Sequence, residues 1–478
     1  MTAADSAATA ARRGPAAVLL PLALAQFLCS YAGSSMNVMI NDISTDLHTT
    51  VHGVQVAITL FLLVMAALMI PGGKLTDRYG RTRCFTAGLA LFGIGAVISA
   101  VSPNLTVLII GNSILEGIGT ALLIPPVYIL TTLLFTQLTS RARAFGVISA
   151  MGGIGAAAGP LLGGLITATL GWRAAFGVQA LIIVVIIGLA RRITDPLPAD
   201  PTRPFDTPGA VRSATGLVLL VTGILALDTN GWAALILITA GVLVLIWFYV
   251  GIRAAERAGR EPLLSTGLFR NRTSNLGMLT QNTQWMLLTG VSFVVAAYLQ
   301  VVHGLDAIET GVIFTAETGG LLVASLAAGR LARRLTQRTL ILNGFGTTIV
   351  GIVILVVMAG EATSAWGFVP GLLLIGLGLG LMLTPSVTVV QSSFPEALQG
   401  EISGLSRAVS NLGSTLGAAI AGTILVAGIT TTPERSYGLA LVVLAGIGAL
   451  GLVAAVLLPT IRPAPDREPA PETKSSPA

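Results

Sequence analysis

Two glutamates lie well inside long apolar stretches of this 478-residue chain, Glu116 in residues 105–130 and Glu317 in residues 309–329. A charge at the middle of a bilayer costs about 2.5 to 3.5 kcal/mol on insertion scales, so such acids usually face a cavity and have a function. Removal from water favours the neutral carboxyl, which can release its proton when water or a cationic ligand arrives. We therefore predict that both acids exchange protons or bind a substrate. The alternative is a pair of structural glutamates that stay protonated or hydrogen-bonded.

The stretches that must position these acids have the composition of membrane spans. Of all residues 54% are hydrophobic and 10% are charged, and the mean hydropathy is +0.86, which excludes an ordinary soluble protein. About 20 apolar residues cross a bilayer core as a helix, so the sequence predicts an all-α membrane protein. The fourteen expected spans are residues 16–40, 53–71, 84–101, 105–130, 144–168, 174–190, 213–228, 232–251, 275–301, 309–329, 339–359, 366–391, 402–427 and 437–459.

The basic residues are distributed unevenly between the two sides of these spans. With the N-terminus in the cytoplasm, 25 of the 27 Lys and Arg residues fall in cytoplasmic segments, and only Arg173 and Arg435 fall outside. This asymmetry predicts a multi-pass protein of the plasma (inner) membrane with both termini cytoplasmic. Arg407, near the start of span 402–427, is assigned to the same topology signal, and the alternative is that it lines the inner vestibule. The net charge of +6 thus reflects topology, and the bilayer rather than nucleic acid is the expected partner.

A repeat of about 258 residues divides the chain into two similar halves. The glycines at 146, 155, 159 and 164 return at 404, 413, 417 and 422. The repeat predicts two bundles of six helices, with two extra spans between them. The expected domains are an N-terminal cytoplasmic segment 1–15, a six-helix bundle 16–195, a linker with the two extra helices 196–272, a second bundle 273–461, and a Pro-rich charged tail 462–478 that is expected to be disordered.

The loop between the second and third spans contains the most specific motif. It reads Gly73-Lys-Leu-Thr-Asp-Arg-Tyr-Gly-Arg-Thr-Arg83, so one carboxylate lies among cations and two glycines. A glycine permits a tight turn, and the carboxylate can pair with arginine or with a helix N-terminus. The loop resembles the signature loop of the major facilitator superfamily, which implies a switch that locks the cytoplasmic side in the outward-open state. The alternative is an ordinary basic loop. The matching residues are Gly73, Leu75, Asp77, Arg78, Gly80, Arg81 and Arg83.

A second motif lies in the fifth span. Gly155 and Gly159 are one helical turn apart, which lets two helices approach closely, and Pro160 is expected to bend the helix. Together with Gly163 and Gly164 these residues resemble the antiporter signature of the superfamily. General helix packing is the alternative, but the second copy of the repeat has alanine at the position of the proline, which favours the signature.

Further segments resemble the fourteen-helix drug:proton antiporter branch of the superfamily across nearly the whole chain. The resemblance implies the major facilitator fold, with two six-helix bundles and two extra helices. In that branch the first helix usually carries an aspartate where this chain has Ala32, and the fourth helix carries an arginine where this chain has Ser113, three residues before Glu116. The segments that carry the resemblance are 172–176, 205–209, 261–264, 268–271 and 298–300.

The function implied by this resemblance is secondary active transport. We expect proton-coupled efflux of small lipophilic or cationic compounds by alternating access, with protons as the coupling ion. An uncoupled facilitator or importer stays open because of Ala32, and a non-transporting receptor is a third possibility. The sequence has no nucleophile elbow, phosphate loop or metal-ligand cluster beyond the isolated pair His48 and His52, so we expect no enzyme, no cofactor and no metal. A monomer is expected.

Overall fold

The structure is a computed structural model that describes residues 15–460, apart from 136–137, 192, 196–198, 203, 228–229, 333, 362–363, 395–398 and 429–432. The expected tail 462–478 and nearly all of the expected N-terminal segment 1–15 lie outside the described residues. The side chain of Asp77 also lies outside the described part.

All regular structure in the described part of the chain is helical. The first half consists of α2 (Pro15–Ser35), η1 (Met36–Met39), α3 (Ile40–Asp46), α4 (Val51–Tyr79), α5 (Arg81–Ala100), α6 (Leu105–Leu108), η2 (Ile109–Glu116), α7 (Gly117–Leu134), α8 (Leu138–Leu170) and α9 (Trp172–Ala190). The extra pair is α10 (Thr207–Leu225) and α11 (Gly231–Arg257), followed by η3 (Thr266–Arg270). The second half consists of α12 (Arg272–Val301), α13 (Ala307–Leu331), α14 (Gln337–Glu361), η4 (Ala365–Phe368), α15 (Val369–Gln391), α16 (Gln399–Gly428) and α17 (Pro433–Leu457).

Fourteen of these segments are long and apolar enough to cross a membrane. Thirteen are single spans, and the fourteenth is α8, which bends by 41° between Ala150–Ala156 and Ala158–Leu170. The bend lies one turn before Pro160, whose ring withholds a hydrogen bond from the carbonyl of Ala156. The prediction of fourteen spans is confirmed. The first span is longer than expected, because the chain stays helical through η1 and α3 to Asp46.

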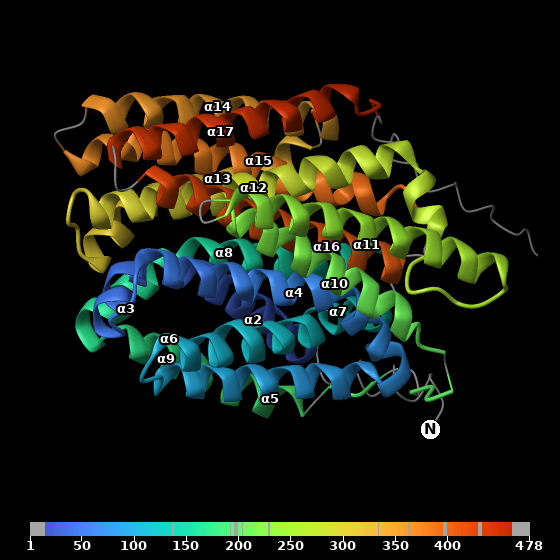
Figure 1. The fold of residues 1–478 in the computed structure, drawn as a ribbon. Coiled ribbons are helices and arrows are strands. Elements are labelled where there is room, and N and C mark those ends of the chain that lie inside the picture. Colours follow the sequence, from blue (N-terminus) through green and yellow to red (C-terminus); the bar gives the residue numbers. More distant parts are fainter. Residues whose placement is uncertain are drawn as a thin grey trace, which may run out of the picture.

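The two halves lie against each other along two seams. In Figure 1 the blue and teal helices of the first half lie below the yellow and red helices of the second half. Helix α8 contacts α2 of its own half and α13 of the other half, whereas α16 contacts α12 of its own half and α4 of the other. Each half therefore contributes one helix that joins its own core to the opposite half.

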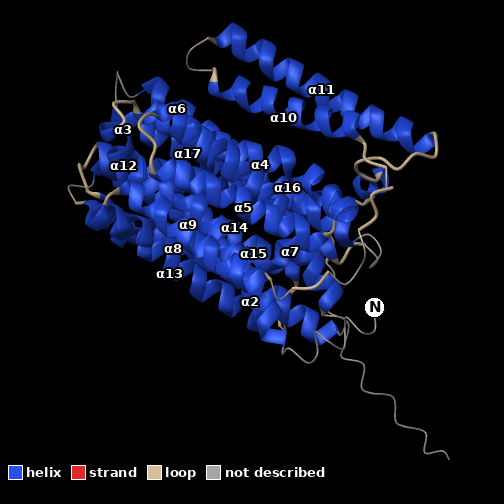
Figure 2. Ribbon diagram, turned by 90° about the horizontal axis from the view of Figure 1, so that it is seen from below, coloured by secondary structure: helices blue, strands red, loops and turns tan. Residues whose placement is uncertain are grey.

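The extra helices cover one of these seams. Helix α10 packs on α4 and α16 through a small apolar cluster of Leu63, Val221 and Ala419. Thr423 of α16 also donates a hydrogen bond to the carbonyl of Ile224 at 3.2 Å. Figure 2 shows that α10 and α11 form a pair at the edge of the bundle. Helix α11 therefore lies at the periphery and is largely exposed to lipid.

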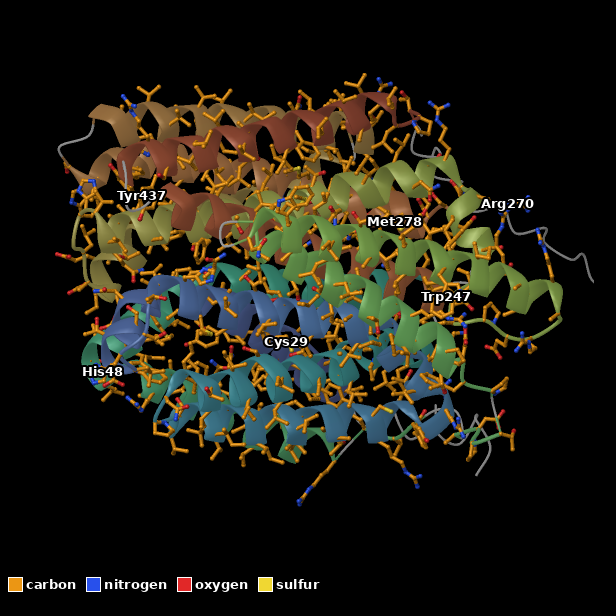
Figure 3. All side chains as sticks on the ribbon, in the orientation of Figure 1. Cys29, His48, Trp247, Arg270, Met278 and Tyr437 are labelled. Atoms are coloured by element: carbon orange, nitrogen blue, oxygen red, sulfur yellow. The ribbon has the colours of Figure 1, made fainter. Side chains whose placement is uncertain are left out.

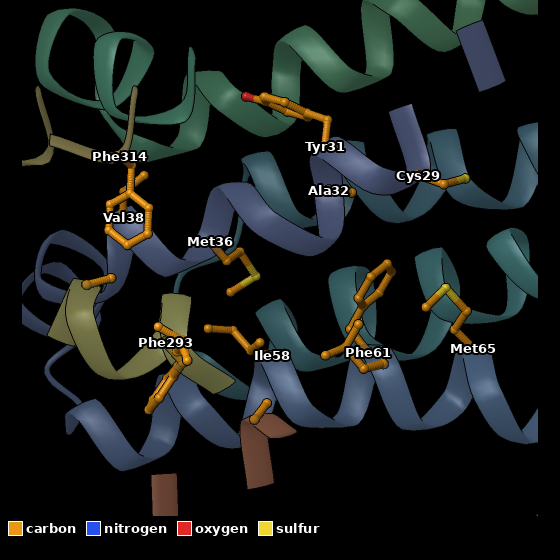
Figure 4. Packing of buried hydrophobic residues seen from close by; sticks show 14 of the residues in the cluster. Cys29, Tyr31, Ala32, Met36, Val38, Ile58, Phe61, Met65, Phe293 and Phe314 are labelled. Carbon is orange, nitrogen blue, oxygen red and sulfur yellow. The ribbon is translucent and has the colours of Figure 1, made fainter. Parts of the chain in front are cut away.

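The apolar core extends through both halves. Figure 4 shows Ala32 and Met36 of the first span near Phe61 and Met65 of α4, with Phe293 of the second half close by. Ala32, which takes the place of the expected aspartate, is only 2% exposed. The side chain at this position therefore contributes to packing and supplies no ionisable group.

The two ends of the bundle differ in charge. One end, here called the basic end, contains the turn from α4 to α5 with its arginines, and it also contains the C-terminal ends of α11 and α13. Figure 3 places Arg270 near this end and His48 at the opposite end. Near His48, Arg173 forms an ion pair with Asp46.

Candidate functional site

A cavity of about 100 Å³ lies between the two halves. Helices α2, α4, α7 and α8 line it from the first half, and α12, α13 and α16 line it from the second. Most of its surface is apolar, with Leu62, Met65 and Phe314 among the lining side chains. Ligand pockets usually measure about 300 to 1,000 Å³. The cavity in this conformation is therefore contracted and must widen to hold a drug-sized molecule.

Glu317 is the one acid among the described lining residues of this cavity. It lies on α13, ten residues and hence about 15 Å from the start of the helix. The side chain is 5% exposed, and its two carboxylate oxygens accept hydrogen bonds from Oγ of Ser292 at 3.3 and 3.4 Å. No described cation forms an ion pair with it. A proton can therefore bind or leave this carboxyl without an ion pair having to break.

Glu116 lies elsewhere, inside the first half. It is fully buried at the end of the π-helical segment η2, and its carboxylate accepts hydrogen bonds at 3.4 Å from Ser99 Oγ and from Asn112 Nδ2. A Cβ added to Gly95 of α5 would lie 2.8 Å from Cγ of Glu116, so the acid faces α5. Thr120, one turn later, does line the cavity. The structure thus brings only one of the two predicted acids to the cavity.

Arg407 is the second charged side chain in the lining, although its place near the end of a span favours a topology signal over a site residue. Its guanidinium lies 4.5 Å from the ring centroid of Tyr128 and donates a hydrogen bond to the Tyr128 hydroxyl. That hydroxyl donates to Gln26 Oε1 at 3.0 Å, and Gln26 Nε2 donates to Ser30 Oγ at 3.3 Å. This network joins α16 of the second half to α7 and α2 of the first half. The signal available in the sequence was the position of an arginine inside a span.

The signature loop forms the turn from α4 to α5 at the basic end. Helix α4 ends at Tyr79, and Gly80 adopts φ +95°, so the tight turn expected at Gly80 is present. The first amides of α5, those of Arg81 and Thr82, donate to Asp195 Oδ2 at 2.5 and 3.3 Å. A carboxylate at a helix N-terminus is favourable because it accepts hydrogen bonds from free amides and is attracted to the positive end of the helix dipole. Asp195 thus occupies a position of the kind that the sequence predicts for Asp77, whose side chain lies outside the described part, so the role of Asp77 stays a prediction.

Lys74 of the same loop connects the two halves. Its Nζ lies 3.1 Å from Glu261 Oε1, in the segment before the second half, and 3.5 Å from Glu401 Oε1, at the start of α16. Glu401 also accepts a hydrogen bond from the amide of Ser265 at 3.3 Å. These contacts join the end of α4 to the linker and to the start of α16 at the basic end. The other motif residues lie around them, with Gly73 and Leu75 in the last turns of α4 and with Arg78 and Arg83 flanking the turn.

The glycines of the second motif bring α8 into contact with both halves. A Cβ at Gly155 would collide with the carbonyl of Phe27, and a Cβ at Gly159 would collide with Ser34. Gly163 faces α2 as well, since a Cβ there would lie 3.1 Å from Ser35 Cβ. Gly164 instead abuts the carbonyl of Ala307, at the start of α13.

Pro160 touches the second half and the cavity at once. It lines the cavity, and its carbonyl oxygen would lie 2.8 Å from a Cβ added to Gly311 of α13. The proline therefore lies where the α8–α13 seam meets the cavity.

The second half repeats this packing. A Cβ at Gly413 or Gly417 of α16 would collide with the carbonyls of Asn282 and Met286 in α12, and a Cβ at Gly422 would collide with Gln55 of α4. Gly413, Gly417 and Gly422 thus face the helices that correspond to the partners of Gly155, Gly159 and Gly164, although the atoms they meet differ.

Comparisons with known proteins agree with this architecture. The chain is 28% identical over 422 residues to Multidrug resistance protein Stp of Mycobacterium tuberculosis (strain CDC 1551 / Oshkosh), covering 87% of this chain and 77% of that protein. It is 30% identical to Cephamycin export protein CmcT of Amycolatopsis lactamdurans, and the match covers 91% of this chain and 90% of that protein. A crystal structure of the peptide transporter POT in complex with sulfate shares the fold, with a TM-score of 0.69, 18% identity and coverage of 96% and 97%. The family model of the Major Facilitator Superfamily matches residues 22–418, which is most of this chain. The chain therefore belongs to this transporter superfamily.

Proposed function

We propose that this protein is a secondary active transporter that exports small lipophilic or cationic compounds in exchange for protons. The observation that carries the proposal is the position of Glu317, a buried acid without a described ion-pair partner in the wall of a mostly apolar cavity between the halves. The names of the relatives, a multidrug resistance protein and a cephamycin export protein, support the same class of activity. Methionines such as Met65 and Met69 suit varied apolar ligands because they are flexible.

The proposed orientation places the basic end in the cytoplasm. Cytoplasmic loops carry an excess of Lys and Arg, and the loops around Arg78, Arg81 and Arg83 fit this rule. Both termini would then be cytoplasmic, in the plasma (inner) membrane. Residues 16–195 and 273–461 would act as the two transport domains of a monomer, and they would rock about the central cavity.

In this mechanism Glu317 alternates between two ligands. When the cavity opens away from the cytoplasm, the carboxyl takes up a proton and a cationic substrate leaves. When the cavity opens to the basic end, release of the proton leaves a carboxylate that attracts the next cation. Opening toward the basic end must break the Arg407–Tyr128 bond and the contacts of Lys74. The signature loop, residues 73–83, would therefore act as the conformational switch.

Glu116 has a different role in this proposal. Because it faces α5 and not the cavity, it would support coupling through the packing of α5 against η2 and α7. It could contact a substrate only if the π-helical segment rearranged, and π-helical turns are frequent at functional sites.

The test uses purified protein in liposomes, with the fluorescent cation ethidium as probe and an imposed pH gradient. Glu317→Gln should abolish gradient-driven accumulation but retain exchange of the probe at equal pH. Glu309→Gln, which changes an exposed glutamate of the same helix, is the matched control and should retain both activities. Undiminished gradient-driven transport by Glu317→Gln would refute the assignment.

Ala32 gives a second candidate function, an uncoupled facilitator. The buried alanine supplies no ionisable group where related transporters are expected to carry one. If the unmodified protein moves the probe at the same rate with and without a pH gradient, the facilitator is favoured over the antiporter.

A further inference from the structure

A second pocket, of about 210 Å³, lies at the basic end and shares no lining residue with the central cavity. The last turns of α11 form one wall, with Tyr249, Arg253, Glu256 and Arg257, and η3 forms the other with Thr266 and Arg270. The proposed transport function uses none of these residues. Figure 3 shows Arg270 at the right-hand end of the bundle and Trp247 on the same side of the view.

The pocket is strongly positive. Its three guanidiniums and one carboxylate leave a net charge of +2. The carboxylate of Glu256 accepts hydrogen bonds from the amide of Thr266 at 2.6 Å and from the Thr266 hydroxyl, which fixes η3 against α11. Within the described residues, no acid lies within ion-pair distance of Arg253, Arg257 or Arg270. Three exposed arginines therefore line a space whose one carboxylate, that of Glu256, is bonded to Thr266 and forms no ion pair with them.

Aromatic side chains lie beside this cluster and on the preceding turns of α11. The guanidinium of Arg253 lies 5.4 Å from the ring centroid of Tyr249, whose ring meets Phe269 edge to face at 5.9 Å. Nearby, Arg212 lies 4.2 Å from the ring centroid of Trp247. Tyrosine, tryptophan and basic residues gather at the depth of lipid headgroups. The pocket therefore lies at the boundary between hydrocarbon and water.

An exposed apolar strip leads from the pocket along α11. Val242, Ile246 and Val250 are 43%, 54% and 55% exposed. In the series Val242, Ile246, Val250, Arg253 and Arg257, each residue follows the one before by three or four positions. This spacing places all five on one face of the helix. An amphipathic molecule with an anionic head in the pocket would thus lay its chains along this face.

We infer that this pocket binds the phosphate of an anionic phospholipid, with the acyl chains along α11. The arginines supply hydrogen bonds and charge to the phosphate oxygens, and basic pockets beside transmembrane helices are known to take such headgroups. A free phosphate would use the same arginines but would gain nothing from the apolar strip. The site is independent of the substrate and of the coupling ion.

The test measures lipid binding to the full-length protein in an uncharged detergent, by native mass spectrometry and by thermal stability. Phosphatidylglycerol should bind saturably to the unmodified protein. Each juxtamembrane arginine contributes about 1 kcal/mol, roughly fivefold in affinity, so Arg253→Gln/Arg257→Gln/Arg270→Gln should bind on the order of 100-fold more weakly. The control, Arg191→Gln/Arg330→Gln/Arg334→Gln, removes three exposed arginines of the same end from outside the pocket and should bind normally.

Three results would overturn the inference. Equal losses in the two triple variants would assign binding to diffuse surface charge. Equal binding of phosphatidylcholine would remove the requirement for an anionic head. Equal protection by water-soluble glycerol phosphate would make the pocket a free-anion site. If the triple variant does not fold, Arg270→Gln alone should weaken binding about fivefold, and unchanged binding would count against the site.

Discussion

The two halves of this transporter use the same packing but place their charges differently. Gly155 of α8 and Gly413 of α16 each press against a carbonyl of the first helix in their own half. In contrast, the buried acid of the first half, Glu116, faces α5, whereas that of the second half, Glu317, faces the cavity. The two halves therefore share their helix packing but differ in the positions of their ionisable groups. The second half supplies both charged groups of the cavity, and the first half supplies the neutral partners Tyr128 and Gln26.

The largest expected effect tests whether the packing of the two halves is equivalent. Gly155→Ala and Gly413→Ala should each destabilise the protein by about 3 kcal/mol or more, because the new Cβ would lie 2.2 to 2.3 Å from a backbone oxygen that cannot move aside. The controls Gly177→Ala and Gly446→Ala add a Cβ where nothing lies within 4 Å, and they should be neutral or stabilising by up to about 1 kcal/mol. Thermal unfolding in detergent measures all four. If Gly413→Ala leaves thermal stability unchanged while Gly155→Ala lowers it, the packing of the two halves is not equivalent.

The next effect tests the connection between Arg407 and Tyr128. Tyr128→Phe removes a hydrogen bond to a charged group, which contributes about 1.5 to 3 kcal/mol, so opening at the basic end should become about 10- to 100-fold more frequent. Cys29 lines the cavity, and its labelling by a thiol reagent in a Cys84→Ser background reports that opening.

Tyr437→Phe is the control for this measurement. Its hydroxyl contacts the carbonyl of Ala297 at 3.5 Å within the second half, so its loss should leave Cys29 labelling unchanged. Equal labelling rates in Tyr128→Phe and the unmodified protein would show that the bond does not restrain opening.

A smaller effect is expected at the ion pairs of Lys74. These contacts are partly exposed, and such pairs contribute about 0.2 to 1 kcal/mol each. Because Lys74 has two such pairs, Lys74→Gln should speed the labelling of Cys29 by about 2- to 30-fold, and the difference should shrink at 1 M salt because screening weakens exposed pairs. Arg173→Gln breaks the Asp46 pair at the opposite end within one half and should change the rate less. A salt-independent acceleration would contradict an electrostatic origin.

The smallest effect is expected at Glu116. Glu116→Gln keeps a polar group that can bond to Ser99 and Asn112, and the side chain does not reach the cavity. Gradient-driven transport in liposomes should stay within about twofold of the unmodified protein. Loss of proton coupling in a folded Glu116→Gln protein would give the acid of the first half the same role as Glu317.

Much of the fold could be predicted because its causes are local. Hydropathy determines the spans, and Pro160 bends its own helix wherever that helix packs. The partners of functional side chains are not local. Arg407 meets Tyr128 from 279 positions away, and Asp195 caps α5 from 114 positions away. The direction of Glu116 could not be predicted either, because the π-helical turn before it shifts the face that a regular helical period would assign. The domain boundaries and the roles of the motifs remain predictions.

The hydrogen bond between Arg407 and Tyr128 has a consequence for energy conversion in the proposed exchange. One proton that enters for each monovalent cation that leaves moves no net charge, so the pH gradient and not the membrane potential would supply the energy. One pH unit corresponds to about 1.4 kcal/mol, and a hydrogen bond to a charged group contributes about 1.5 to 3 kcal/mol. A gradient of about one to two pH units is therefore comparable with the free energy needed to break this bond. The partly exposed ion pairs of Lys74 add only about 0.2 to 1 kcal/mol each to that requirement.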